Sequence, residues 1–163
     1  MSNKRHERTS ARRCAVQLLY TGELQGKTPQ EVLDEGLCLV DCEPLSDYAL
    51  QLVNGTAEHR AEIDEQLASV SENWKVERMP VVDRAILRLA VYEMLHEDDV
   101  PISVTINEAV ELAKDFGGED ESPRFVNGVL GHIARNLEQV DEAAAASGAG
   151  GASETETSEK TEA

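Results

Sequence analysis

Apolar residues recur at intervals of three and four positions along most of this chain, which is the spacing of a buried helix face. A clear example runs through Val82, Ala85, Ile86, Leu89 and Ala90, with charged residues at positions between them. Almost every segment from about residue 10 to residue 137 shows the same periodicity. The pattern therefore predicts an all-α protein.

Several predicted helix ends carry residues that suit a start or a stop. Thr28 and Ser46 precede apolar stripes, and a hydroxyl there can accept a hydrogen bond from a free N–H of the first turn. Pro29 and Pro123 suit the first helical turn, where the missing N–H costs nothing. Gly117-Gly118 should end a helix, because glycine readily adopts the left-handed conformation.

Some glycines inside predicted helices indicate a weak point or a close contact. One long helix, straight or bent, is expected from Ser46 to about residue 70, with Asn54-Gly55 as a weak point inside it. Gly128 and Gly131 each cost roughly 1 kcal/mol relative to alanine. We therefore expect a neighbouring helix or a ligand to pack closely against the backbone at these two positions.

The helix after Pro80 is predicted to be amphipathic, with its charged side chains away from the core. These side chains are those of Asp83, Arg84, Arg88 and Glu93. In the next predicted helix, Glu108 and Glu111 lie one turn apart, as a metal site or a proton-exchange site would require. Surface carboxylates of an amphipathic helix are the simpler interpretation.

The charge of the chain is uneven. Its 32 acidic and 15 basic residues give a formal net charge of −17, which opposes binding to phosphates. Five of the basic residues nevertheless lie within the first 13 positions, where Glu7 is the only acid. Residues 1–9 are therefore predicted to form a basic N-terminal arm before a helical domain at residues 10–137, so nucleic-acid binding stays open.

Residues 138–163 have a different composition. They contain seven acids and one base, Lys160, among Ala, Gly, Ser and Thr. Such a segment buries too little apolar surface to offset the entropy of ordering. It is predicted to be an acidic disordered tail, which either improves solubility or competes weakly with RNA for the basic arm.

The sequence contains no apolar run of about 18 residues and no secretion signal at its start, so we expect a cytoplasmic protein without a membrane partner. Three cysteines favour reduced thiols over a disulfide framework. Cys38 and Cys42 lie four residues apart, but they lack the second ligand pair of a structural zinc site. We expect no metal and no cofactor.

Known catalytic patterns are missing from the sequence. The four histidines, His6, His59, His96 and His132, are scattered, and none has a second metal ligand at H-x-x-x-H spacing. No nucleophile elbow, phosphate-binding loop or dinucleotide fingerprint occurs. The sequence therefore predicts a binding protein and not an enzyme.

One face of the first predicted helix has the chemistry of an RNA contact. Arg13, Gln17 and Tyr20 lie within one or two turns of each other and point the same way. They combine a cation, an amide and an aromatic ring. The same spacing also fits an ordinary solvated helix side with Tyr20 half buried.

Four motifs together resemble one protein family, the transcription antitermination factors of the NusB family. They are ARRCAVQLLY at 11–20, VDRAILRLAVYEM at 82–94, DVPISVTINEAVELAKDFGGED at 99–120 and FVNGVL at 125–130. The resemblance implies two three-helix bundles packed across one another, with about seven helices. It also implies binding to boxA RNA of nascent ribosomal RNA transcripts with NusE, a protein of the small ribosomal subunit, and assembly on RNA polymerase. Monomer and homodimer both stay open.

The resemblance further implies which residues bind. Arginines of the first helix would neutralise phosphates, Gln17 and Tyr20 would meet bases or sugars, and Asp120 would accept hydrogen bonds from base amino groups. Phe125 fits a core role equally well. Asp83, Arg84 and Arg88 would face NusE. The residues implied in RNA binding are Arg5, Arg8, Arg12, Arg13, Gln17, Tyr20, Phe116, Asp120, Ser122, Arg124, Phe125 and Asn127.

Two other functions stay open. The first is a helical adaptor that binds proteins without specific RNA recognition. The second is a piece of an RNA methyltransferase, since NusB-like domains also occur fused to such enzymes. A methyltransferase would need an α/β cofactor-binding pattern, and the 163 residues contain none.

Overall fold

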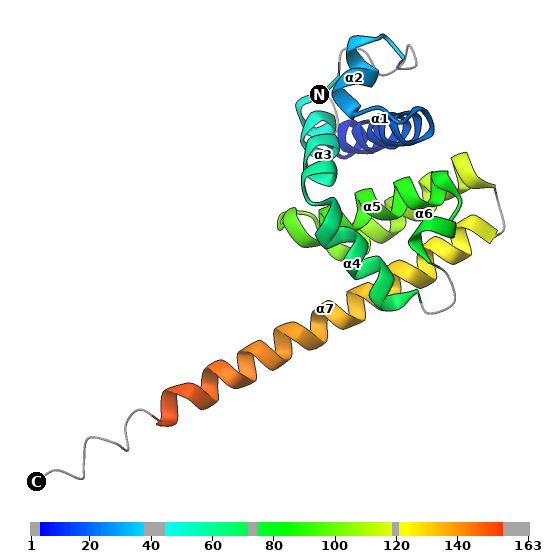
Figure 1. The fold of residues 1–163 in the computed structure, drawn as a ribbon. Helices are drawn as coiled ribbons and strands as arrows, with labels where there is room; N and C mark the ends of the chain where they lie inside the picture. The colour runs from blue at the N-terminus through cyan, green and yellow to red at the C-terminus, as the bar shows by residue number, and fades with distance from the viewer. Residues whose placement is uncertain (1–3, 38–44, 72–74, 119–120, 155–163) are drawn as a thin grey trace, which may run out of the picture.

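A computed structural model of the protein describes residues 4–37, 45–71, 75–118 and 121–154 (Figure 1). Within these ranges the chain forms seven α-helices and one 3₁₀ turn, with no strand, which confirms the all-α prediction. None of these helices combines the length and the apolar character needed to cross a lipid bilayer. The elements are α1 (Lys4–Gln25), α2 (Pro29–Asp34), α3 (Asp47–Glu58), α4 (Arg60–Val70), η2 (Val76–Arg78), α5 (Val81–His96), α6 (Ile102–Gly117) and α7 (Glu121–Glu154).

The helices form two groups that pack across one another, as expected. α1 packs against α2 and α3, whereas α5, α6 and α7 form the second group with α4 laid against α5 and α7. Figure 1 shows the first group above the second. α5 also contacts α1 and α3, so it is the element that joins the two groups.

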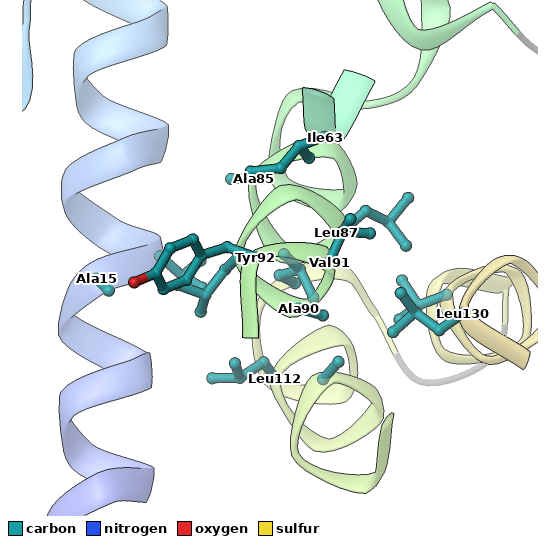
Figure 2. Packing of buried hydrophobic residues seen from close by; sticks show 14 of the residues in the cluster. Ala15, Ile63, Ala85, Leu87, Ala90, Val91, Tyr92, Leu112 and Leu130 are labelled. Atoms are coloured by element: carbon teal, nitrogen blue, oxygen red, sulfur yellow. The ribbon is translucent and has the colours of Figure 1, made fainter. Parts of the chain in front are cut away.

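α5 is the central helix, and its sequence explains only part of its burial. Every residue from Asp83 to Glu93 is buried. Figure 2 shows Tyr92 of α5 pointing toward α1 and Leu87 pointing toward α7. A helix surrounded on all sides is expected to be apolar all round, yet this one carries four charged side chains. The prediction that Asp83, Arg84, Arg88 and Glu93 lie away from the core is therefore wrong, because each is between 1% and 9% exposed.

The predicted helix ends are confirmed where the structure describes them. The Thr28 hydroxyl accepts a hydrogen bond from the backbone N–H of Glu31 at 3.2 Å. The Ser46 hydroxyl accepts one from Ala49 at the same distance. Gly118 has φ of +103° directly after α6, so the stop at Gly117-Gly118 uses a backbone conformation that other residues rarely adopt.

The prediction of one long helix from Ser46 to about residue 70 is wrong, because two helices form and the bend between them lies at His59 and not at Asn54-Gly55. α3 continues through Gly55 and ends at Glu58, and His59 then separates it from α4. Gly55 has a packing role instead. A Cβ atom there would lie 2.3 Å from the Tyr92 ring, so only glycine lets the α3 backbone approach that ring.

Gly128 and Gly131 of α7 do not serve helix packing. Among the described residues, and leaving aside the chain neighbours and the adjoining backbone of α7, no heavy atom lies within 4 Å of a Cβ placed at Gly128. At Gly131 only the Arg135 guanidinium comes near, at 3.6 Å. The expectation that a neighbouring helix packs on the backbone here is wrong. Close approach of a ligand to Gly128 stays a prediction.

Both ends of the described chain are helical. α1 already begins at Lys4, so residues 4–9 of the predicted arm form its first turns. α7 continues past residue 137 to Glu154 and projects from the helical body (Figure 1). Residues 138–147 are exposed, and residues 155–163 lie outside the described residues. The division into arm, domain and tail stays a prediction.

Candidate functional site

Arg13 and Phe116, both predicted to contact RNA, meet between α1 and α6. The guanidinium carbon of Arg13 lies 5.4 Å from the centre of the Phe116 ring. Its Nη2 atom also pairs with Asp115 Oδ2 at 2.5 Å. The Arg13 side chain is 46% exposed, so its charge faces solvent beside an aromatic ring. A cation beside an aromatic ring suits a nucleotide, because the cation can pair with the phosphate and the ring can stack on the base.

Gln17, Tyr20 and Phe116 line one cavity of about 620 Å³, here named the aromatic groove. Tyr20 is 37% exposed, and Leu24 beside it is also exposed. Carbon-rich side chains make up most of the wall, so the groove can receive an unstacked base or an apolar protein side chain. Its remaining lining residues are Leu18, Thr21, Leu24, Leu37, Pro80, Val81 and Val82.

A smaller cavity of about 300 Å³ adjoins the aromatic groove, and we name it the Asp83 hollow. Both cavities are lined by Pro80 and Val82 at the start of α5. The hollow adds Asp83, Ser122 and Phe125, three more of the predicted residues. Residues predicted for RNA and for a protein partner therefore converge on one side of α5.

Asp83 and Ser122 hold the α6–α7 junction against the start of α5. The Ser122 hydroxyl donates a hydrogen bond to Asp83 Oδ1 at 2.5 Å, and both residues are buried. Burial raises the pKa of Asp83, and the hydrogen bond from Ser122 opposes this only in part. Gly117 also belongs to this contact. A Cβ atom there would lie 2.4 Å from Ser122 Oγ, so only glycine leaves room for the Ser122 side chain. Neither Asp83 nor Ser122 is a freely exposed contact.

The first turns of α1 line a third hollow, of about 440 Å³, with Lys4, Arg5 and Arg8 on one side. Asp99 and Glu108 also line it, so its charge is mixed. Arg8 donates a hydrogen bond to Asp99 at 2.8 Å, and this bond raises the pKa of Arg8 and lowers that of Asp99. The predicted basic arm therefore has part of its charge neutralised within the protein.

Arg12 also lines this hollow, but its guanidinium is paired inside the protein. It is 3% exposed, and its Nε and Nη2 atoms donate to the two carboxylate oxygens of Glu93 at 2.6 and 2.9 Å. The Tyr48 hydroxyl donates to the same carboxylate at 3.1 Å. Burial lowers the pKa of Arg12, but the hydrogen bonds and charge of Glu93 outweigh it, so the guanidinium stays charged. Arg12 therefore positions α1 and does not face a phosphate in this structure.

Arg84 and Arg88 are likewise used inside the protein. Arg88 donates to both oxygens of Asp64 at 2.8 and 3.0 Å. Arg84 pairs with Glu23 and donates to the carbonyl oxygens of Val76 and Glu77 in η2 at 3.1 and 3.0 Å. These contacts tie α5 to α1, α4 and η2. Neither cation is presented to a partner on the surface.

The remaining predicted residues lie on α7 or outside the described ranges. Arg124 and Asn127 are exposed on the first turns of α7, and Phe125 is half buried in the Asp83 hollow. Arg5 is exposed at the start of α1. Asp120 lies outside the described residues, as do Cys38 and Cys42.

Sequence reasoning missed the buried polar network around Arg12. Glu93 was assigned to a helix face away from the core and Glu108 to the surface, yet Glu93 is 1% exposed and Glu108 accepts a hydrogen bond from the Thr9 hydroxyl at 2.9 Å. No motif or spacing in the sequence singled out Tyr48. The partners lie far apart along the chain, so no local spacing could have paired them.

Comparisons with known proteins agree on one family. The chain matches the NusB family model over residues 9–135. "Transcription antitermination protein NusB" from a Nocardioides species is 45% identical over 129 residues, which cover 79% of this chain and 94% of that protein. The protein of the same name from Saccharopolyspora erythraea is 48% identical over 128 residues, which cover 78% of this chain and 86% of that protein.

A solved structure supports the same assignment. It is a crystal structure of antitermination factors NusB and NusE in complex with double-stranded RNA. One chain in it is 28% identical to this protein, with a TM-score of 0.66. The match covers 80% of this chain and 98% of that chain, so it spans almost the whole body of the solved protein.

Proposed function

Since the chain belongs to the NusB family, we propose that it acts as an RNA-binding transcription antitermination factor. It binds the boxA element of nascent ribosomal RNA transcripts together with NusE, and it supports assembly of an antitermination complex on RNA polymerase. One observation carries the proposal. The family match extends over α1, α5, α6 and the start of α7, and these elements bring Arg13, Tyr20 and Phe116 to one side of the molecule.

The proposed RNA surface divides its tasks among the exposed side chains. Arg5, Arg8, Arg13 and Arg124 neutralise phosphates. The rings of Tyr20 and Phe116 stack on unpaired bases, as is usual in recognition of single strands. Side-chain groups that read base edges or sugars are provided by Gln17, Asn127 and Asp120.

RNA binding requires two ion pairs to change partners. Arg8 pairs with Asp99, and Arg13 pairs with Asp115. Surface pairs of this kind contribute about 0–1 kcal/mol each, so a phosphate can replace the carboxylate at little cost. The pair between Arg12 and Glu93 is buried and stays intact.

The partner surface is proposed to include the Asp83 hollow. Asp83 lies at its base, and Phe125 and the adjoining aromatic groove provide apolar contact area. Arg84 and Arg88 contribute by holding α5 in place through Glu23 and Asp64. The proposed activity is binding and not catalysis, with no cofactor and no membrane.

A helical adaptor without specific RNA recognition is the second candidate. It is favoured by the net charge of −17 and by the apolar wall of the aromatic groove, which would suit a protein segment. The two candidates differ in one measurable property. An adaptor binds NusE but no specific RNA, and its affinity for NusE is the same with and without RNA.

The deciding experiment is a titration of boxA RNA and of a scrambled RNA, each with and without NusE. We expect boxA to bind more tightly than the scrambled RNA, and more tightly still when NusE is present. Four phosphate contacts on a single strand predict a slope of about −3 in a plot of log affinity against log salt concentration. Equal affinity for both RNAs, with and without NusE, would contradict the proposal and favour the adaptor.

Two exposed arginines of α7 provide a matched pair of variants. Arg124 lies at the proposed RNA surface, whereas Arg135 lies about three turns further along the same helix. The Arg124→Ala variant should bind boxA more weakly and reduce the magnitude of the salt slope by about 0.7, the share of one phosphate contact. The Arg135→Ala variant should leave both quantities unchanged.

A further inference from the structure

Two histidines and a glutamate from separate parts of the sequence meet at the junction of α3 and α4. They are His59 between these helices, Glu62 in the first turn of α4 and His96 at the end of α5. His59 Nδ1 lies 3.5 Å from Glu62 Oε2, and His96 Nε2 lies 3.2 Å from the same oxygen. One donor atom from each residue lies within 4.8 Å of the other two. The prediction that the histidines are scattered is wrong for this pair.

The three donor atoms have the chemistry and spacing of a zinc site. Zn²⁺ binds imidazole nitrogen and carboxylate oxygen at about 2.0–2.2 Å, so two ligands of a tetrahedral site lie about 3.3–3.5 Å apart. The two distances to Glu62 match that spacing. We propose that His59, Glu62 and His96 bind one Zn²⁺ ion, with water in the fourth position.

The imidazole rings have room to reach the geometry that an ion requires. They stack with centres 4.0 Å apart and planes inclined by 23°, an arrangement that sets their lone pairs side by side. Binding of a common ion requires one ring to turn until both lone pairs converge. The side chains of His59 and His96 are 36% and 29% exposed, so no packed core opposes that turn.

The surroundings favour a dication over an anion. Glu58 precedes His59 and Glu97 follows His96 in the chain. Glu97 accepts a hydrogen bond from the hydroxyl of Tyr92 at 3.2 Å, and the Tyr92 ring stacks on that of His96 with centres 5.5 Å apart. Arg60, the cation of α4, pairs with Asp64 at 3.8 Å. The carboxylates around the site repel one another, and a bound Zn²⁺ ion would attract all of them. Their negative charge therefore favours binding of the ion.

An ion at this site would connect the bend between α3 and α4 to the end of α5. His59 and Glu62 lie at the bend, whereas His96 belongs to the helix that joins the two groups. Zn²⁺ would therefore stabilise the crossing of the two groups against thermal unfolding, because it binds only when the three ligands are together. The site shares no residue with those proposed for RNA binding, so its test does not depend on that function.

The test is a titration of the full-length, tag-free protein with Zn²⁺, followed by calorimetry and by competition with a chromophoric chelator. We expect the wild type to bind one ion through this cluster and to show a higher melting temperature with Zn²⁺ than with a chelator. The His59→Ala and His96→Ala variants should each lose more than about tenfold in affinity, because each removes a ligand. Both should also lose the thermal shift.

The control is His132→Ala, which removes an exposed histidine from α7 and should bind as the wild type does. The three cysteines are kept in every variant, so weak thiol binding is a common background. His96→Gln provides a variant of similar size, and its unfolding without zinc shows whether the fold is intact. A wild type that binds no Zn²⁺, or that binds no better than His96→Gln, would overturn the proposal.

Discussion

Neighbouring arginines of α1 have opposite roles. Arg12 is buried and holds both oxygens of Glu93, whereas Arg13 is exposed beside Phe116. Removing one member of a buried ion pair leaves an uncompensated charge, which costs about 3–5 kcal/mol. Breaking an exposed pair costs about 0–1 kcal/mol. We therefore expect Arg12 to contribute to the stability of the fold and Arg13 to contribute to RNA binding.

We expect Arg12→Ala to lower the free energy of unfolding by about 3–5 kcal/mol, because Glu93 would stay buried without its partner. Arg13→Ala should change that energy by less than about 1 kcal/mol while weakening boxA binding. Urea unfolding and an RNA titration of the two variants measure both effects. Loss of stability in Arg13→Ala, or its absence in Arg12→Ala, would refute these roles.

Glycines inside helices also differ in role, and the difference depends on what each helix packs against. In α3, Gly55 faces the Tyr92 ring of α5, and a Cβ there would lie 2.3 Å from it. In α7, Gly128 is exposed and has open space around it within the described residues. Alanine at the first position must displace a buried ring, whereas alanine at the second gains helix propensity alone.

The Gly55→Ala variant should be less stable than the wild type by at least about 2 kcal/mol, because overpacking of a dense core forces the ring to move. Gly128→Ala should be more stable by up to about 1 kcal/mol. Thermal and urea unfolding of both variants provide the comparison. If RNA also packs on the backbone at Gly128, the second variant will bind boxA more weakly despite its greater stability.

The molecule as a whole is acidic, and its charge is distributed unevenly. Seven acids and one base fall in residues 138–163, while five bases fall in the first 13 positions. The first ten of the tail residues are exposed on the part of α7 that projects from the body (Figure 1). The negative charge of these residues therefore repels RNA at a distance and contributes little to the stability of the fold.

Removing residues 138–163 should speed the association of boxA RNA at low salt by up to about tenfold, since fewer carboxylates repel the phosphates. The gain should disappear near 1 M salt, where charges are screened beyond about 3 Å. The melting temperature should stay the same, because residues 138–147 are exposed. Stopped-flow association at several salt concentrations is the measurement, and a gain that persists at high salt would exclude an electrostatic cause.

The sequence alone determined the class of fold, most helix limits and the family. Apolar spacing locates the buried stripe of a helix, and Thr28, Ser46 and Gly118 act on the few residues next to them. These are local effects, so they can be read from short stretches of sequence. Helix spacing also identified Arg13 and Tyr20 as candidates, and the family resemblance added Phe116. The fold brings the three residues to one side of the molecule.

Only the tertiary structure decided what the charged residues and the glycines do. Whether Arg12 faces solvent or Glu93 depends on a partner far along the chain, and the same holds for Asp83 with Ser122. His59 and His96 become neighbours only when α5 packs beside the bend of α3 and α4. The periodicity of a helix states which residues share a face, but the burial of that face is set by every helix packed around it.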